Sequence, residues 1–195
     1  IEMYQFGKQH FRSVPVDFDL DEDSPVGGMD IIHTPGHCPG QVCIRVGDML
    51  IVGDLVLSRT TPHQSPESIT NYVGLGHYAD SLKKVSQIEG IRLALGGHED
   101  PIPDLYSRID AIQKSHKRKL DTIEKIMKDV DSPMTISEIS KTMYPNAREY
   151  HVLLAIEEVG AHIEYLYERG YLTIMNLHEF ENDENPALLY QVIDE

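Results

Sequence analysis

Cysteine is scarce in this chain of 195 residues, and no long apolar run is present. The two cysteines, Cys38 and Cys43, make no disulfide framework, so we expect free thiols in a reducing compartment. No apolar run approaches membrane-spanning length, and no positively charged leader precedes an apolar segment at the amino end. We therefore expect a cytoplasmic protein without membrane contact.

Basic residues are also few. Lys and Arg number 17 against 32 Asp and Glu, which gives a formal net charge of −15. Such a balance argues against binding to phosphate backbones. The densest positive patch, residues 116–119, is expected to be a solvated helix face, although contact with nucleic acid there stays open. With 41% hydrophobic and 25% charged residues and no low-complexity tract, the chain has the composition of a globular protein.

Three apolar segments end in glycine followed by a residue that could bind a metal. Residues 29–32 lead into the turn 33–37, residues 49–52 into Gly53 and Asp54, and residues 91–95 into Gly96, Gly97 and His98. In α/β sheets, functional groups collect just beyond the carboxyl ends of strands. We expect His37, Asp54 and His98 to meet there.

The remaining segments up to about residue 100 complete an α/β pattern. Residues 1–28 are polar and predict a loop and a strand entry, while 41–46 and 49–52 predict an antiparallel hairpin. Residues 55–76 form a long loop, mixed and largely polar, that could be a substrate lid. A helix is predicted from Tyr78, with Leu82, Val85 and Ile88 on one stripe, followed by the strand at 91–95.

A different pattern begins near Pro101. Apolar residues spaced by three or four predict one long helix over 105–130 that joins two domains, 1–114 and 115–195. Capping-box spacing at 135–138 and 146–149 predicts the starts of two further helices, the second ending at Gly170. Apolar runs at 171–175 and 188–192 flank the acidic turn 182–186. Three helices and a terminal hairpin are typical of a winged-helix α+β domain.

Imidazole and carboxylate ligands suit zinc, iron or manganese at an open hydrolytic site. A metal at such a site lowers the pKa of bound water to near neutrality. No Ser-His-Asp set or activated cysteine is evident, so water is the natural nucleophile. Cys38, next to His37, stays open as an extra soft ligand.

The segments 34–37 (Thr-Pro-Gly-His), 52–54 (Val-Gly-Asp) and 96–99 (Gly-Gly-His-Glu) resemble the later metal motifs of the metallo-β-lactamase superfamily, which includes the glyoxalase-II-like hydrolases. The resemblance implies that His37 completes a first metal site, that Asp54 bridges two metals, zinc foremost, and that His98 binds the second. It also implies an αββα sandwich, with a winged-helix domain like the one that follows this fold in a branch of the superfamily.

The superfamily's first motif, His-x-His-x-Asp-His, occurs nowhere in this sequence. The chain thus resembles only the second half of the sandwich, and this half cannot build a complete two-metal site by itself. Either upstream sequence supplies the remaining ligands or the protein is a degenerate relative.

Several residues near the expected site are candidates for substrate contact or for support of the ligands. His63, Tyr72 and His77 lie in or near the polar loop and could bind substrate or transfer a proton, or they could be ordinary loop residues. Glu99 could orient His98 or simply be exposed. His33 is expected to be structural.

The leading hypothesis is a metal-dependent hydrolase that attacks an ester, thioester, lactone or phosphodiester of a small-molecule substrate, with Asp54 helping to hold the nucleophile. The winged helix would then pack on the hydrolase domain, wall the active site or mediate homodimer formation. The competing hypothesis is a non-catalytic relative whose winged helix binds a partner or nucleic acid. Fold and ligands leave the substrate open.

Overall fold

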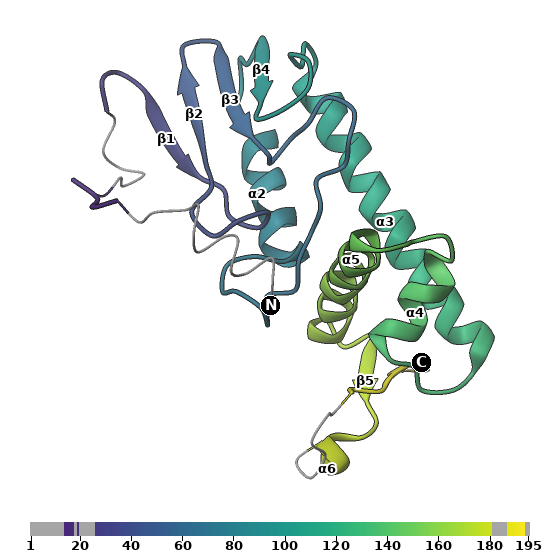
Figure 1. Cartoon of the computed structure of the whole chain (residues 1–195). Coiled ribbons are helices and arrows are strands. Elements are labelled where there is room, and N and C mark those ends of the chain that lie inside the picture. The colour runs from purple at the N-terminus through teal and green to yellow at the C-terminus, as the bar shows by residue number, and fades with distance from the viewer. Residues whose placement is uncertain (1–13, 18, 20–25, 181–186, 194–195) are drawn as a thin grey trace.

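The larger sheet brings three strand ends to one edge. The computed structural model describes residues 14–17, 19, 26–180 and 187–193. The strands lie in the order β1, β2, β3, β4 (Figure 1), and they cover Asp30–His33, Val42–Val46, Met49–Gly53 and Leu93–Gly96 respectively. β2 is antiparallel to both β1 and β3, and β4 is parallel to β3. Thus β1, β3 and β4 run the same way, and their carboxyl ends share an edge.

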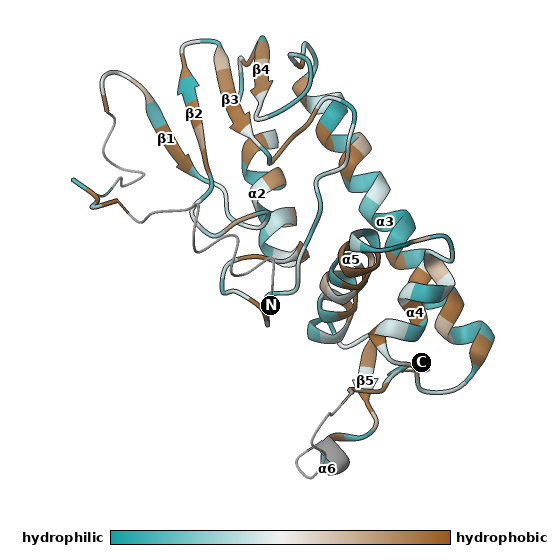
Figure 2. Ribbon diagram, in the orientation of Figure 1, coloured by the Kyte–Doolittle hydropathy of each residue, from teal (hydrophilic) through white to brown (hydrophobic). Residues whose placement is uncertain are grey.

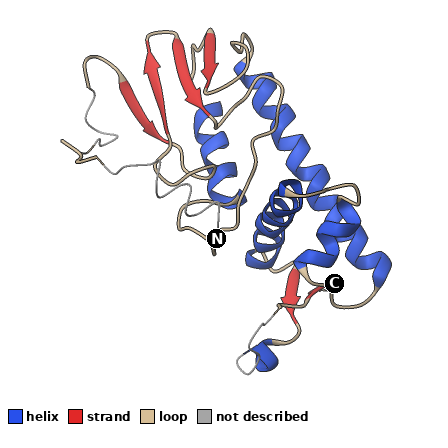
Figure 3. Cartoon of the chain, in the orientation of Figure 1, coloured by secondary structure: helices blue, strands red, loops and turns tan. Residues whose placement is uncertain are grey.

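Helices cover one face of this sheet. α2 (Leu75–Ser86) and the first half of α3 (Leu105–Val130) lie on the same side of the strands (Figure 3). Along β3, Leu50 and Val52 are fully buried in this core, whereas Met49 and Ile51 on the opposite face are exposed. Burial of each such side chain contributes roughly 1.5–3 kcal/mol. The alternation matches a strand with one covered face.

The carboxyl-terminal part packs around the second half of α3. It contains α4 (Ile136–Met143), α5 (Tyr150–Glu168), β5 (Leu172–Ile174), α6 (Leu177–Phe180) and β6 (Tyr190–Val192), with β5 and β6 antiparallel. Hydrophobic and hydrophilic residues alternate along α3 (Figure 2), and its apolar side serves two core clusters. Ile109 and Ile112 belong to the sheet cluster, while Ile123 and Met127 belong to the helical one.

Several predictions from the sequence are confirmed: the β2–β3 hairpin, the crossover through α2, the bounds of α3 and the terminal strand pair. α2, however, begins at Leu75 rather than Tyr78, because the Gly74 amide donates to the Gly36 carbonyl and fixes the helix start. The predicted capping box at 146–149 is wrong, since α5 has Glu149 as its N-cap with no side-chain bond. α6 was not predicted.

The predicted domain boundary at 114/115 falls inside the continuous helix α3, and the described residues show no separate winged-helix domain. The acidic turn 182–186 lies outside the described residues, and so does most of the polar start of the chain. Within the described ranges, none of the helices combines the length and apolar character that crossing a bilayer requires.

Candidate metal centre

The turn that carries His37 is fixed to α2. Gly36 has a φ of 133°, and a Cβ atom there would lie 2.4 Å from the Cα atom of Tyr78. Only glycine allows the turn to approach the helix backbone this closely. Ser81 donates from its hydroxyl to the Pro35 carbonyl at 2.7 Å. The position of His37 is therefore set by packing of the turn on α2.

The ring of His37 is oriented by the loop that follows β3. Its Nδ1 atom lies 3.0 Å from the carbonyl oxygen of His63. Because a carbonyl can only accept, Nδ1 carries a proton, and in the neutral ring the Nε2 atom keeps its lone pair. That Nε2 atom lies 3.7 Å from Oδ2 of Asp54. This is the arrangement of a metal-binding imidazole supported from behind.

Asp54 follows β3 directly, and its carboxylate lies against Gly97, the residue after β4. Its Oδ1 atom is buried and has no hydrogen-bond partner. A Cβ atom on Gly97 would lie 2.4 Å from that oxygen, and the Gly97 amide donates to the Gly53 carbonyl at 2.9 Å. A buried carboxylate oxygen without a donor costs about 1–3 kcal/mol, so the site favours a cation at this position.

His98 completes the group of three. Its Nε2 atom lies 3.4 Å from Oδ2 of Asp54. The side chain of His98 is 72% exposed, whereas those of His37 and Asp54 are 29% and 28% exposed. The three strand ends thus deliver two imidazoles to one carboxylate that has an unpartnered oxygen. This donor set fits zinc, iron or manganese, and the role of the three residues as ligands stays a prediction.

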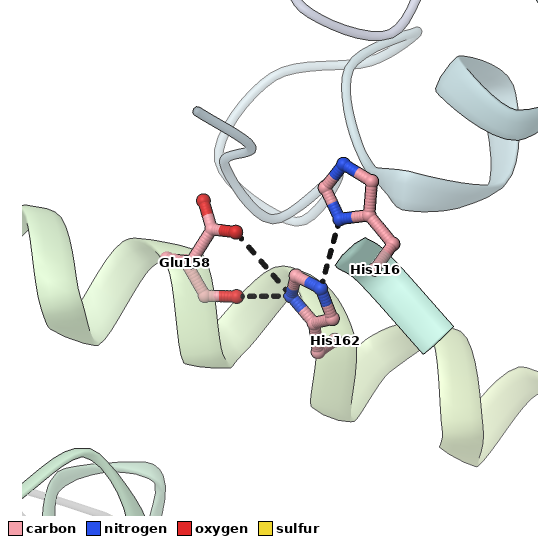
Figure 4. Close-up of side chains that lie close together, drawn as sticks. All are labelled: His116, Glu158 and His162. Atoms are coloured by element: carbon pink, nitrogen blue, oxygen red, sulfur yellow. Dashed lines mark hydrogen bonds and ion pairs between the residues drawn. The ribbon is translucent and has the colours of Figure 1, made fainter. Parts of the chain in front are cut away.

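A second group that could hold a metal ion lies between α3 and α5. His116, Glu158 and His162 are buried, and one ligand atom from each lies within 4.8 Å of the others. Figure 4 shows the three side chains and the bonds between them. The Nδ1 atom of His116 lies 3.1 Å from Nε2 of His162, whose Nδ1 atom lies 2.6 Å from the backbone carbonyl of Glu158.

These bonds assign the protons of the two rings. Since the Glu158 carbonyl accepts from Nδ1 of His162, the Nε2 atom of that ring must accept from Nδ1 of His116. A metal bound by both rings would require the proton of His116 to sit on Nε2 instead, the buried atom that lacks a partner. Burial lowers the pKa of His116 to about 3 and keeps this ring neutral.

Glu158 is already engaged by cations and amides. One oxygen pairs with Lys119 from α3, and the other lies 3.1 Å from Nδ1 of His63 and accepts from the Gln64 amide at 2.9 Å. Burial alone would raise the pKa of Glu158, but the hydrogen bond with His63 and the charge of Lys119 outweigh it and hold the pKa below its ordinary range. The carboxylate is thus a stable anion.

The ring of His63 contacts α5. Its Nε2 atom lies 3.2 Å from Glu157. The hydrogen bond with Glu158 is the largest cause that raises the pKa of this imidazole, and the bond with Glu157 adds to it. The carbonyl of His63 bonds to His37. The structure thus gives His63 a direct link to the candidate ligands through its backbone, while its side chain joins the loop to α5.

The other candidate side chains bond to groups other than the three candidate ligands. Tyr72 is exposed, and its ring lies 5.7 Å from that of His77, which bonds to Glu67 at 2.9 Å. The carboxylate of Glu99 is bound by the loop at 58–60; the hydrogen bond from the Thr60 hydroxyl is the largest cause that lowers its pKa to about 2. His33 bonds to the Pro39 carbonyl at 2.8 Å, in keeping with a structural role.

The structure also describes the two thiols and the basic patch. Cys38 is exposed and Cys43 is buried, and both are free, as the sequence predicts. The patch at 116–119 is not wholly a solvated face, because His116 is buried and Lys119 turns inward to Glu158.

The carboxylates of α5 are functional groups that the sequence patterns did not single out. The available signal was the adjacent pair Glu157 and Glu158 between apolar residues of the helix, where charges must find partners.

Comparison with known proteins places the fold. Residues 10–126 match the metallo-beta-lactamase superfamily. A metallo-beta-lactamase family protein from Thermus thermophilus is 25% identical with a TM-score of 0.68, over 85% of this chain and 49% of that one. A beta-lactamase domain protein from Burkholderia ambifaria is 22% identical with a TM-score of 0.78, over 93% and 54%.

The chain thus spans about half the length of these two solved relatives. A search of curated proteins finds no match. The superfamily match covers residues 10–126 of 195, more than half of the sequence, and its span includes all three strand ends that carry His37, Asp54 and His98. On this match, the chain belongs to the metallo-beta-lactamase superfamily.

Proposed function

We propose that this protein is a metal-dependent hydrolase in which His37, Asp54 and His98 bind metal ions, with zinc the first choice and two ions in the complete site. The observation that carries the proposal is the convergence of two imidazoles on the Asp54 carboxylate, whose buried Oδ1 atom has no partner. The superfamily match supports the same interpretation. When bound, such ions act as Lewis acids and lower the pKa of water to near neutrality.

The residues of this chain would bind the metal ions and orient the side chains that hold them. The carbonyl of His63 holds the proton of His37 on Nδ1, so the lone pair on Nε2 faces Asp54. Asp54 supplies the negative charge between the two rings, and Gly97 gives its Oδ1 atom room. His98, as the most exposed of the three, borders the solvent side where substrate would arrive.

We propose that the body of a small-molecule substrate binds in a cavity whose wall includes His63 but none of the three candidate ligands. Its volume is about 480 Å³, within the range of small-molecule sites. Apolar atoms of Tyr144 and Leu154 and the polar side chains of Lys119 and His151 contribute to its wall. We propose an ester, thioester, lactone or phosphodiester as substrate.

The finer fold assignment is part of the proposal. We propose that α3, α4 and α5 with the β5–β6 pair form a winged-helix-like unit built onto the sheet through α3. We further propose that the open face of the sheet, where Val46, Met49 and Ile51 are exposed, packs against a second layer in an αββα sandwich.

Hydrolysis by the natural full-length protein tests the function. With p-nitrophenyl acetate and bis(p-nitrophenyl) phosphate as probes and Zn²⁺ or Mn²⁺ added, we expect activity that a chelator removes. Asp54→Ala should lower the rate by more than the roughly 10–100-fold typical of residues that only support ligands. The matched control is Asp48→Ala, since Asp48 pairs with Arg92 in an exposed turn. Equal rates in both variants would contradict the proposal and favour the non-catalytic alternative.

A further inference from the structure

The loop at 63–68 is held by carboxylates of α5. The Gln64 amide donates to Glu158 at 2.9 Å, and the Glu67 amide donates to Glu164 at 2.7 Å. The ring of His63 lies between Glu157 and Glu158. Three carboxylates of one helix therefore bind backbone and side-chain groups that are more than 90 residues earlier in the chain.

The shape of α5 suits this contact. Glu157, Gly160 and Glu164 follow one another at helical spacings of three and four, so they share one face. A Cβ atom on Gly160 would lie 2.8 Å from Cγ of Pro66, which is buried. The absence of a side chain at Gly160 lets the loop lie directly on the helix between the carboxylates.

The same loop orients a candidate ligand. The His63 carbonyl accepts from Nδ1 of His37 at 3.0 Å, and this bond decides which nitrogen faces Asp54. Moving the loop would move the carbonyl, and the His37 ring could then rotate or exchange its tautomer. The side chain of His63 and the amide of Gln64 place this carbonyl, since both bind α5.

We propose that Glu157, Glu158 and Glu164 are positioning residues: they clamp the loop at 63–68 and thereby fix the orientation of His37 through the His63 carbonyl. The clamp makes the helical part a structural component of the candidate metal centre. The proposal rests on the proposed function only for the identity of His37 as a ligand, because the orientation itself can be measured without metal.

Glu164 offers the cleanest test, because its side chain is half-buried and truncating it leaves no cavity in a hydrophobic core. Glu164→Ala removes the acceptor for the Glu67 amide, whereas Glu164→Gln keeps an oxygen that can accept. Glu168→Ala is the matched control, because this exposed carboxylate of the same helix pairs with Arg169. Gly160→Ala displaces the loop by a different route and leaves every carboxylate in place.

The first readout is the pair of ring ¹⁵N shifts of His37 in metal-free protein, at a pH where the ring is neutral. The wild type, Glu164→Gln and Glu168→Ala should show one protonated and one bare nitrogen. Glu164→Ala and Gly160→Ala should show shifts averaged toward each other, together with roughly tenfold faster exchange of the Glu67 amide proton in Glu164→Ala. Faster exchange with unchanged His37 shifts in both variants would overturn the proposal.

The second readout is Zn²⁺ affinity of the full-length protein. Glu164→Ala and Gly160→Ala should weaken it by roughly 10–100-fold, with Glu164→Gln close to wild type. Wild-type affinity in both disruptive variants would also overturn the proposal. If the wild type itself binds no Zn²⁺, the proposed function fails, and the ring shifts in the metal-free protein still decide whether the clamp orients His37.

Discussion

At the scale of single residues, the most informative atom is Oδ1 of Asp54. It is buried without a donor, next to a glycine whose missing side chain makes room for it. A carboxylate in such a place destabilises the protein until a cation arrives, which is a common cost at functional sites.

Asp54→Asn removes this charge and should stabilise the metal-free protein by about 1 kcal/mol, or about 2–4 °C in Tm for a chain of this size. The same change should abolish the stabilisation by Zn²⁺, which amounts to about 2.7 kcal/mol for the wild type at a free concentration one hundred times Kd. Thermal unfolding with and without Zn²⁺ measures both effects. An equal response to Zn²⁺ in the two proteins would contradict the assignment of Asp54.

Gly97→Ala should disturb the same carboxylate sterically. The added Cβ would lie 2.4 Å from Oδ1 of Asp54, so the side chain must shift, and we expect Zn²⁺ affinity to fall at least tenfold. Gly40→Ala is the control, because a Cβ there meets no atom within 4 Å. Calorimetric titration of both variants gives the comparison, and equal affinities would show that Asp54 does not need this room.

Cys43 predicts a pH dependence. Burial raises the pKa of its thiol from 9.0 to about 11, so the folded state favours the neutral form. Its contribution to stability is fully present below pH 9 and is lost as pH rises toward 11. Relative to Cys43→Ala, the wild type should lose stability with pH over this range, at up to about 1.4 kcal/mol per pH unit. Urea unfolding measures the free energy of unfolding of both proteins at each pH. The same pH dependence in both proteins would contradict a buried thiol.

The meeting of His37, Asp54 and His98 could be anticipated because each follows an apolar segment and a glycine, and such strand ends meet at one edge. The burial of His116 was implicit in the stripe of α3, since this residue falls on the apolar positions. Its contact with His162 could not be predicted, because nothing local in either helix specifies which face meets which.

At the scale of secondary structure, capping chemistry separates two helices with similar sequence signals. Thr135 and Glu138 form both bonds of a capping box at the start of α4. Asn146 has the same spacing to Glu149, but the helix begins later, and Glu149 itself is the N-cap with a φ of 50°. The pattern was correct for α4 and wrong for α5, because Asn146 lies within a turn that the Ala147 amide closes onto the Tyr144 carbonyl, before the helix begins.

Thr135→Ala should therefore destabilise the protein by about 1 kcal/mol, the usual effect of removing an N-cap side chain. Asn146→Ala should change the free energy of unfolding by only a few tenths, since this exposed side chain caps no helix. Urea unfolding of the two variants measures the difference. If Asn146→Ala lowered the free energy of unfolding as much as Thr135→Ala does, the observed start of α5 would be contradicted.

At the scale of the whole molecule, α3 and α5 join the two parts of the chain. α3 contributes to both core clusters, so the predicted division at 114/115 cuts through a shared helix. α5 binds the loop at 63–68 through its carboxylates. The length of α3 could be predicted from its periodicity, whereas the loop contact depends on tertiary packing across more than 90 residues and leaves no local pattern.

Metal content of the natural full-length protein, purified without chelator and measured by plasma mass spectrometry, tests the assignment of the metal centre most directly. Asp54→Ala removes a ligand at the strand ends, and His116→Ala removes one from the buried group between α3 and α5. We predict near two metals per chain in the wild type and in His116→Ala, with clear loss in Asp54→Ala. Metal retained in Asp54→Ala and lost in His116→Ala would contradict the strand-end site and move the metal to the helices.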